Sequence, residues 1–275
     1  KKKEIESPRL CAELLLSRQL DISRLKLYIE YGQPVGKKDL DQYRAMIKRV
    51  ADGETVQYIT GAQEFWSMDF IVNRSVLIPR PETEILVEQV IRINKENYQE
   101  AGRVHILDMC TGSGAIAVAV ASEISNAEIT ASDISKESLV VAQLNIKRHG
   151  MEKRISLVNG NLFEPFIHHR GCFDIIVSNP PYVTEEEYRL LPDKIRNFEP
   201  KIALESGVDG LSHIRTIIEK APQHLNPGAW LMLEMDPRQI EAVRQIIASN
   251  SSYMGVSVVK DYSHRDRVCI IKKRQ

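Results

Sequence analysis

From Val104 to the end of the chain, short apolar segments alternate with longer amphipathic ones, and this alternation restricts the fold more than any other feature of the sequence. Such alternation predicts an α/β fold, a mostly parallel sheet with helices on both faces. Only seven polar residues, 260–266, separate the last two strand candidates, so we expect an antiparallel pair there. The predicted strands are Val104–Met109, Glu128–Ser132, Ile155–Val158, Phe173–Val177, Ala229–Met235, Gly255–Val259 and Arg267–Ile271. The predicted helices between them are Gly114–Ile124, Ser135–His149, Gly210–His224 and Pro237–Ala248.

The residues before this region have a different pattern. Residues 1–60 predict three short amphipathic helices, and residues 61–81 predict a hairpin linker with two short strands, Gln63–Trp66 and Asp69–Val72. A sheet-containing domain then occupies residues 82–275, opening with a helix from about Glu82 to Asn97. The apolar stripes expected to pack the helices together are Leu10, Cys11, Leu14 and Leu15 in the first helix and Leu40, Tyr43, Ile47 and Val50 in the third.

Composition narrows the function classes. The 275 residues are 43% hydrophobic, and 37 basic residues balance 37 acidic ones, so no overall field draws the chain to nucleic acid or membrane. Four scattered cysteines without a C-x-x-C spacing fit a reducing cytoplasm, and no apolar run approaches the ~20 residues of a membrane span. We expect no membrane association and no nucleic-acid substrate. The chain begins Lys1-Lys2-Lys3 without Met, so we expect residues to precede it.

The glycine-containing turn after the first sheet strand predicts a cofactor site. Gly112 and Gly114 allow a tight turn at a helix start, and Asp133, at the end of the next strand, is placed to bind ribose hydroxyls. The spacing also satisfies the dinucleotide pattern G-x-G-x-x-A. Asp108 favours the alternative, since its carboxylate would repel a pyrophosphate but attract an ammonium group. We therefore expect S-adenosylmethionine. The candidate cofactor-binding residues of the turn are Asp108, Cys110, Thr111, Gly112, Ser113 and Gly114.

Two later loops are less informative. Asn161 follows the third strand, where it would bond an adenine amine with Leu162 or Phe163 covering the ring, although Asn159-Gly160 is equally typical of a plain turn. His168 and His169 are adjacent and no Cys or carboxylate set completes a site, so no metal is predicted. The polar stretch Glu234–Pro237 is interpreted as a cap or link.

The stretch Ser178–Tyr182 predicts the acceptor side of a methyl-transfer site. It follows a buried strand, and its two prolines hold Asn179 on a stiff loop. An amide or planar amino nitrogen is a poor nucleophile, and the Asn179 oxygen and the Pro180 carbonyl can accept its two N–H bonds and orient it. Tyr182 is expected to pack against the same flat group. Upstream, Pro79-Arg80-Pro81 predicts a second stiff loop, with helix initiation as its ordinary interpretation.

Together, I-P-R-P-E-T-E at 78–84, T-G-S-G-A-I-A at 111–117, N-P-P-Y at 179–182 and Asp266-Arg267 resemble the HemK/PrmC family over essentially the whole chain. These are protein-(glutamine-N5) methyltransferases that act on peptide chain release factors. N-P-P-Y alone is shared with base-modifying N-methyltransferases. The resemblance implies a class I S-adenosylmethionine-dependent methyltransferase fold with a seven-stranded sheet and an antiparallel terminal strand, and an N-terminal helical bundle that holds the release factor.

The resemblance also implies site residues. Cofactor binding falls on Cys110 to Gly114, Asp133, Leu162 and Asn179. Glutamine binding falls on Asn179, Pro180, Pro181 and Tyr182, with Arg80 and Glu82 at the entrance, and Asn179, Pro180 and Tyr182 are the expected catalytic residues. The chain departs from the family at three positions, since the family commonly has Gly at 110, Asp at 161 and Gly at 236 where this chain has Cys110, Asn161 and Asp236.

The functional hypothesis is therefore N5-methylation of the glutamine in the Gly-Gly-Gln motif of release factors by a monomeric enzyme. Three alternatives remain open from the sequence: methylation of a ribosomal-protein glutamine, methylation of an amino group on DNA or RNA bases, and a binding module without activity. Asp108, Asp133 and Asn179 are all present, which argues against the inactive module.

Overall fold

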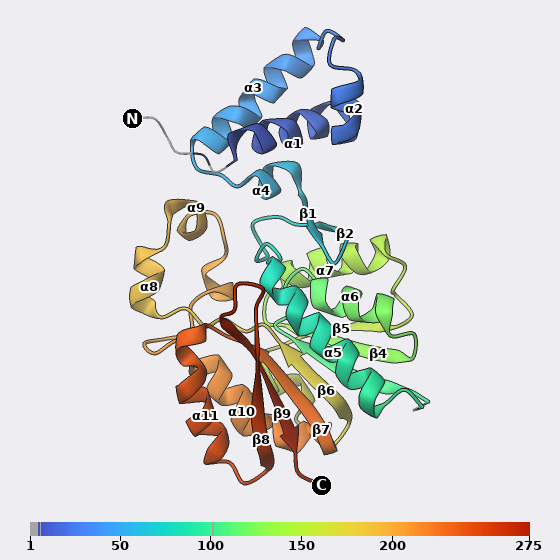
Figure 1. Ribbon diagram of the computed structural model, residues 1–275, viewed down its shortest axis with the longest axis vertical. Coiled ribbons are helices and arrows are strands. Elements are labelled where there is room, and N and C mark those ends of the chain that lie inside the picture. Colours follow the sequence, from blue (N-terminus) through green and yellow to red (C-terminus); the bar gives the residue numbers. More distant parts are fainter. Residues whose placement is uncertain (1–4, 6, 101) are drawn as a thin grey trace.

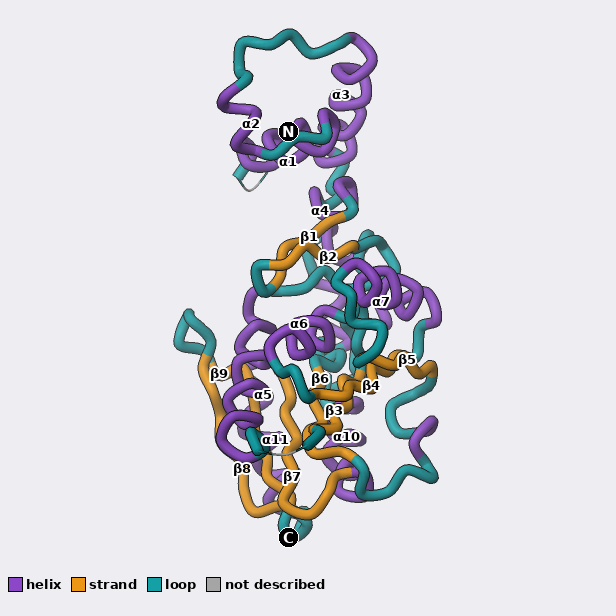
Figure 2. Tube along the Cα trace, turned by 90° about the vertical axis from the view of Figure 1, so that its right-hand side faces the viewer, coloured by secondary structure: helices purple, strands orange, loops and turns teal. Residues whose placement is uncertain are grey.

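The computed structural model describes residue 5, residues 7–100 and residues 102–275; residues 1–4 and 6 of the predicted helical domain lie outside this description. A small helical bundle stands clear of a larger sheet-containing part, and the two are joined through α4 and a hairpin (Figure 1, Figure 2). None of the described helices is long and apolar enough to cross a membrane. The bundle helices are α1 (Pro8–Leu20), α2 (Arg24–Ile29), α3 (Lys37–Ala51) and α4 (Val56–Thr60).

The bundle has a small core. Leu15 is fully buried and packs with Val56 and Ile59 of α4, a helix that the sequence pattern had not indicated. Two residues of the predicted stripes, Leu10 and Ile47, are instead exposed. In the observed packing α3 turns Met46 inward in place of Ile47.

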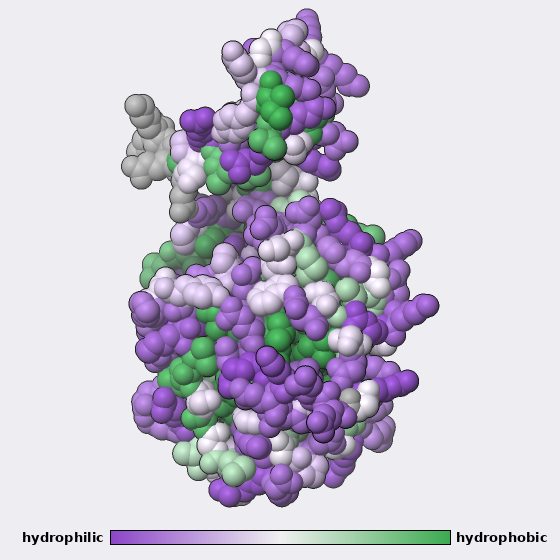
Figure 3. Space-filling view, turned by 45° about the vertical axis from the view of Figure 1, so that its right-hand side comes forward, coloured by the Kyte–Doolittle hydropathy of each residue, from purple (hydrophilic) through white to green (hydrophobic). Residues whose placement is uncertain are grey.

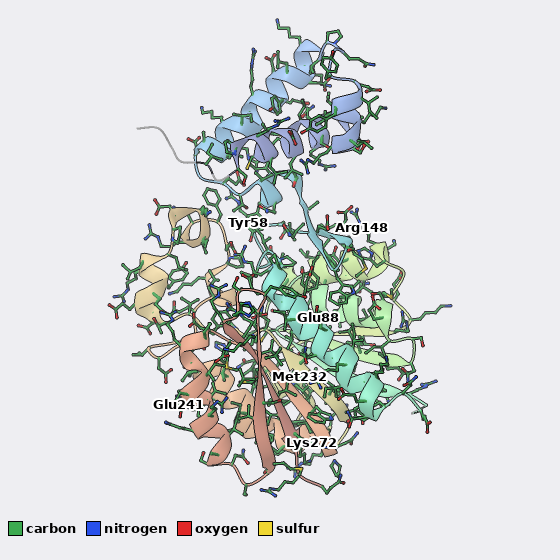
Figure 4. The ribbon with its side chains drawn as sticks, in the orientation of Figure 1. Tyr58, Glu88, Arg148, Met232, Glu241 and Lys272 are labelled. Atoms are coloured by element: carbon green, nitrogen blue, oxygen red, sulfur yellow. The ribbon has the colours of Figure 1, made fainter. Side chains whose placement is uncertain are left out.

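The predicted hairpin is present and is held against the sheet-containing part. Strands β1 (Ala62–Phe65) and β2 (Met68–Ile71) pair antiparallel, and Phe65 and Phe70 are buried. Asn145 of α7 (Lys136–Arg148) accepts from the Ile71 N–H at 2.7 Å and donates to the Ile71 carbonyl at 3.0 Å. At the neck, the Tyr58 hydroxyl donates to the Val76 carbonyl at 2.6 Å (Figure 4).

The predicted seven-stranded sheet is confirmed, with the strand order β5-β4-β3-β6-β7-β9-β8. β9 is antiparallel to both neighbours and every other pairing in this sheet is parallel, which confirms the expected antiparallel end of the chain. The strands are β3 (Val104–Met109), β4 (Ala127–Asp133), β5 (Ile155–Asn159), β6 (Phe173–Ser178), β7 (Leu225–Glu234), β8 (Tyr253–Lys260) and β9 (Asp266–Lys273).

Helices cover both faces of this sheet and enclose two apolar cores. α5 (Glu84–Asn97), α6 (Ala115–Glu123) and α7 pack on one face, and α10 (Ser212–His224) and α11 (Ile240–Ala248) pack on the other. Between β6 and α10 the chain forms short helices that had not been predicted. The remaining helices, 3-10 turns included, are η1 (Pro81–Thr83), η2 (Glu164–Phe166), α8 (Glu185–Leu190), α9 (Asp193–Arg196), η3 (Lys201–Ala203) and η4 (Pro237–Gln239).

Candidate active site

A cavity of about 330 Å³ opens at the carboxyl edge of the sheet. The chain runs from β3 outward through β4 to β5 and then returns to β6 on the other side of β3. Open α/β sheets bind ligands where the strand order reverses in this way. Met109, the last residue of β3, pairs with Ser132 of β4 and Ser178 of β6. The loops that follow these three strands therefore meet around the cavity.

The turn after β3 has the left-handed backbone that its glycines suggested. Gly112 has φ 55° and lines the cavity, and a Cβ atom there would meet nothing within 4 Å. Gly114 has φ 79°, and its Cβ would lie 3.3 Å from the Ala142 Cβ of α7. Cys110, where the family commonly has Gly, also has a positive φ of 60°. Gly112 therefore leaves space for a ligand, whereas Gly114 lets α6 approach α7.

Asp108 takes a different position from the one expected. It is buried behind the turn and is absent from the residues that line the cavity. Its Oδ2 accepts from the Thr111 hydroxyl at 2.5 Å and from the Ala117 N–H at 3.2 Å. Burial raises the pKa of Asp108 to about 7, while the bonds from Thr111 and Ala117 act to lower it. Through Oδ2 the carboxylate holds the shape of the turn, while its Oδ1 is buried without a hydrogen-bond partner among the described residues.

Asp133, which was predicted to bind ribose hydroxyls, lines the cavity. Its Oδ2 accepts from the Gly112 N–H and its Oδ1 from the Ser135 N–H, both at 2.9 Å, which ties the end of β4 to the glycine turn. Burial raises the pKa of Asp133 and these backbone N–H groups act to lower it. Ile134 follows on the cavity wall, and half of its side chain is exposed. An acidic group and an open apolar surface therefore lie side by side.

The loop after β5 closes another side of the cavity with Asn161 and Leu162. The Asn161 Nδ2 donates to Glu164 Oε1 at 3.2 Å, and the Gly160 N–H donates to the Asp133 carbonyl at 3.1 Å. Leu162 has φ 46°, a left-handed conformation that is uncommon for a branched side chain.

The N-P-P-Y segment follows β6. Asn179 and Pro181 line the cavity, whereas Pro180 is buried and does not. The Asn179 Nδ2 donates to Thr83 Oγ1 at 3.1 Å. Tyr182, which we expected to face the same ligand, points its hydroxyl toward Glu234 Oε1 at 3.5 Å and borders a second cavity of about 300 Å³ with Leu190 and Arg238. Burial raises the pKa of Tyr182 above its usual range, so its hydroxyl stays protonated.

The two residues expected at the entrance of the site, Arg80 and Glu82, lie apart in the structure. Arg80 lines the cavity and its Nη2 lies 2.6 Å from Oε1 of the buried Glu199. Glu82 lies outside the cavity lining, 3.7 Å from Arg265 Nη2. A guanidinium paired with a buried carboxylate is held in place, so Arg80 is a fixed positive charge on the cavity wall.

Sequence reasoning missed several lining residues. Ile134 and Gly160 adjoin residues that were predicted at the site, and Thr83 lies inside the I-P-R-P-E-T-E motif, so these three could have been expected from the sequence. Residues of the 202–213 segment could not be expected from it, because this segment reaches the cavity only through the tertiary fold. The residues that were not predicted are Leu77, Pro79, Thr83, Met109, Ala115, Ile116, Ser132, Ile134, Ser138, Gly160, Ile202, Ala203 and His213.

Comparison with known proteins gives matches for both parts of the chain. Residues 1–61 match the family model described as the PrmC N-terminal domain, and residues 83–195 match the methyltransferase small domain. A release factor glutamine methyltransferase from Geobacter sulfurreducens is 39% identical over 97% of this chain and 90% of its own length. The protein of the same name from Bacillus subtilis is 38% identical over 94% and 90%.

Among solved structures, a ribosomal protein L11 methylase from Lactobacillus delbrueckii subsp. bulgaricus has a TM-score of 0.51 and 21% identity. The match covers 74% of this chain and 84% of that one. At this identity the likeness concerns the fold of the sheet and its flanking helices.

Proposed function

We propose that this chain, which belongs to the family of release factor glutamine methyltransferases, transfers a methyl group from S-adenosylmethionine to the side-chain amide nitrogen of the Gly-Gly-Gln glutamine of a release factor. The main support for the proposal is that the carboxyl ends of β3 and β6 lie at the same cavity. The turn after β3 leaves space for a ligand next to the carboxylate of Asp133, and Asn179 after β6 places its amide in the same cavity.

The residues present fit S-adenosylmethionine. Gly112 leaves open space where a ligand approaches the backbone, and Asp133 keeps carboxylate lone pairs for ribose hydroxyls beyond the two N–H bonds that it accepts. Ile134 and Leu162 provide an apolar surface for a flat ring, and Asn161 Oδ1 provides an acceptor for its amine. When bound, the cofactor supplies an electrophilic methyl group on a positively charged sulfur.

The residues of this chain contribute to the reaction by orienting a weak nucleophile, the glutamine amide nitrogen. The lone pair of an amide nitrogen is delocalised, and it becomes available when the N–H groups are held by acceptors and the nitrogen is turned toward the methyl group. The proposed acceptors are Asn179 Oδ1 and the carbonyl of Pro180, which stands between the two cavity-lining residues Asn179 and Pro181. Both acceptors also stabilise the positive charge that develops on the nitrogen, and its proton leaves after transfer.

The N-terminal bundle is the proposed docking surface for the protein substrate. Leu25 and Ile29 of α2 and the neighbouring Tyr31 are 70%, 71% and 90% exposed, an apolar group that the bundle core does not use. Figure 3 shows a mostly hydrophilic face with separate apolar patches on the bundle and on the larger part. Exposed apolar patches of this kind mark protein contacts.

The test is a transfer assay with S-adenosylmethionine labelled on its methyl group. We expect label in a release factor and none in a release factor whose Gly-Gly-Gln glutamine is replaced by Glu. Ribosomal proteins, DNA and RNA serve as competing acceptors in parallel reactions. Label in one of these and none in the release factor would overturn the proposal.

A further inference from the structure

The side chain of Gln239, the last residue of η4, joins three loops at the carboxyl edge of the sheet. Its Nε2 donates to the Tyr182 carbonyl at 2.9 Å and to the Gly210 carbonyl at 3.2 Å. Its Oε1 accepts from the Asp236 N–H at 3.3 Å. One amide therefore ties together the loop after β6, the turn before α10 and the loop after β7. Gln239 was not among the predicted site residues.

The backbone partners determine which end of the Gln239 amide faces which loop. A carbonyl oxygen can only accept and a backbone N–H can only donate, whereas the two ends of an amide side chain have opposite hydrogen-bonding character. The NH₂ group therefore faces the Tyr182 and Gly210 carbonyls, and the oxygen faces the Asp236 N–H. Both hydrogens of the NH₂ group are used, one for each carbonyl.

Gly210 is the residue that allows these groups to approach so closely. Its φ is 70°, and a Cβ atom there would lie 2.5 Å from the Tyr182 carbonyl oxygen and 2.6 Å from Gln239 Nε2. Both distances are too short for a Cβ atom, so a side chain at this position would push the two hydrogen-bonded groups apart.

The hydrogen bond to Tyr182 holds the N-P-P-Y segment at its carboxyl end. At its amino end the segment leaves β6, where Ser178 is paired with β3. Between these two points Pro180 and Pro181 have no N–H, so the backbone there cannot be held by donors of its own. It can be held by donors that reach its carbonyls. Gln239 supplies one at Tyr182, two residues beyond the Pro180 carbonyl that the proposed reaction needs as an acceptor.

We propose that Gln239 is a positioning residue for methyl transfer, which acts through the N-P-P-Y segment by fixing the place of Asn179 and of the Pro180 carbonyl. Gln239 is absent from the cavity lining, so it acts through the segment and not on a ligand. Such placement matters because a misplacement of about 1 Å can lower the rate of a reaction about 100-fold. The inference rests on the proposed function, since it concerns the acceptors of that reaction.

The first test replaces Gln239 by Met, a side chain of similar length that has no hydrogen-bond donor. We expect kcat on a release factor to fall at least about tenfold in Gln239→Met, because the segment loses its anchor. The Kd for S-adenosylmethionine should change less than about threefold, because the glycine turn and Asp133 are untouched. Gln245→Met is the matched control and should keep the wild-type kcat, since Gln245 is exposed on α11 and outside the cavity lining. An unchanged kcat in Gln239→Met, or an equal loss of kcat and cofactor affinity, would overturn the proposal.

The second test, Gly210→Ala, disturbs the same contact and leaves Gln239 in place. Its Cβ would displace the Tyr182 carbonyl and Gln239 Nε2, so we expect the same fall in kcat with cofactor affinity kept. Gly150→Ala is the matched control, because Gly150 has φ 68° and its Cβ would meet nothing within 4 Å, so this variant has the backbone strain without the collision. Equal kcat values in Gly210→Ala and Gly150→Ala would refute the role of this contact. Failure of the proposed function would instead appear in the wild-type protein, as binding of S-adenosylmethionine without methylation of a release factor.

Discussion

Asn179 is the residue on which the proposed chemistry depends most directly. It lines the cavity and uses its Nδ2 to reach Thr83, which leaves its oxygen for the acceptor amide. For Asn179→Ala we expect kcat to fall about 100-fold or more, because one of the two acceptors that orient the nucleophile is lost. Cofactor affinity should change by less than about threefold, since the glycine turn and Asp133 are untouched.

Single-turnover kinetics and calorimetry separate these quantities for Asn179→Ala. Equal losses in turnover and in cofactor binding would show that Asn179 serves the structure of the cavity rather than the transfer step.

Asp133 belongs to the cofactor side of the cavity. Asp133→Ala removes a carboxylate that accepts the Gly112 and Ser135 N–H groups and is placed to bind ribose hydroxyls. Since hydrogen bonds to charged groups contribute about 1.5–3 kcal/mol each, we expect the Kd for S-adenosylmethionine to rise at least about tenfold. Isothermal titration calorimetry measures it directly, and an unchanged Kd would remove Asp133 from the cofactor site.

At the residue scale, the sequence predicted which residues lie near the cavity more reliably than which contacts their side chains make. The carboxyl edge of a parallel sheet brings strand-end residues together, so Gly112, Asp133 and Asn179 were predictable. Asp108 and Tyr182 were predicted at the site, and neither lines the cavity; Asp108 accepts from Thr111 and Tyr182 donates to Glu234. The hydrogen-bond partner of a side chain depends on tertiary packing, so the contact between Asn179 and Thr83, which are distant along the chain, could not be predicted from a local pattern.

Among the elements, α2 offers the sharpest test of substrate docking. Replacing Leu25 and Ile29 together by Ser removes apolar surface that is 70% and 71% exposed and that the bundle does not need for its own packing. We expect KM for the intact release factor to rise at least about tenfold and KM for a short Gly-Gly-Gln peptide to stay unchanged, because the peptide does not reach the bundle.

Met254→Ser on β8 is a matched control for the α2 variant, since Met254 is 60% exposed and lies outside the bundle. A double variant that methylates the intact release factor with wild-type KM would exclude α2 as the docking element.

Helices and strands with a clear apolar periodicity could be predicted from the sequence, whereas very short ones could not. All seven strands of the large sheet were predicted from the alternation, and the antiparallel pairing of the last two was predicted from the short segment 260–266. β7 begins at Leu225, earlier than predicted, because Pro227 and Gly228 obscured its start. The short helices α4, α8 and α9 are only four to six residues long, too short for a helical period to be recognised.

In the whole molecule, the hairpin connects the bundle, which is the proposed docking domain, to the sheet-containing part that holds the cavity. Tyr58 lies at the neck between the bundle and the larger part (Figure 4), where it contacts Val76. The chain then reaches Arg80 and Thr83, which line the cavity. The segment that leaves the bundle thus supplies both a wall of the cavity and the hydrogen-bond partner of Asn179. Tyr58 at the neck and Thr83 on the cavity wall are fewer than thirty residues apart along the chain.

The most direct measurement is tandem mass spectrometry of a release factor after reaction with the wild-type protein and S-adenosylmethionine. We predict one added methyl group on the side-chain amide of the Gly-Gly-Gln glutamine, and its near absence when Asn179→Ala replaces the wild type. A methyl group on another residue, or no methylation while calorimetry shows the cofactor bound, would contradict the assignment of this cavity to glutamine methylation.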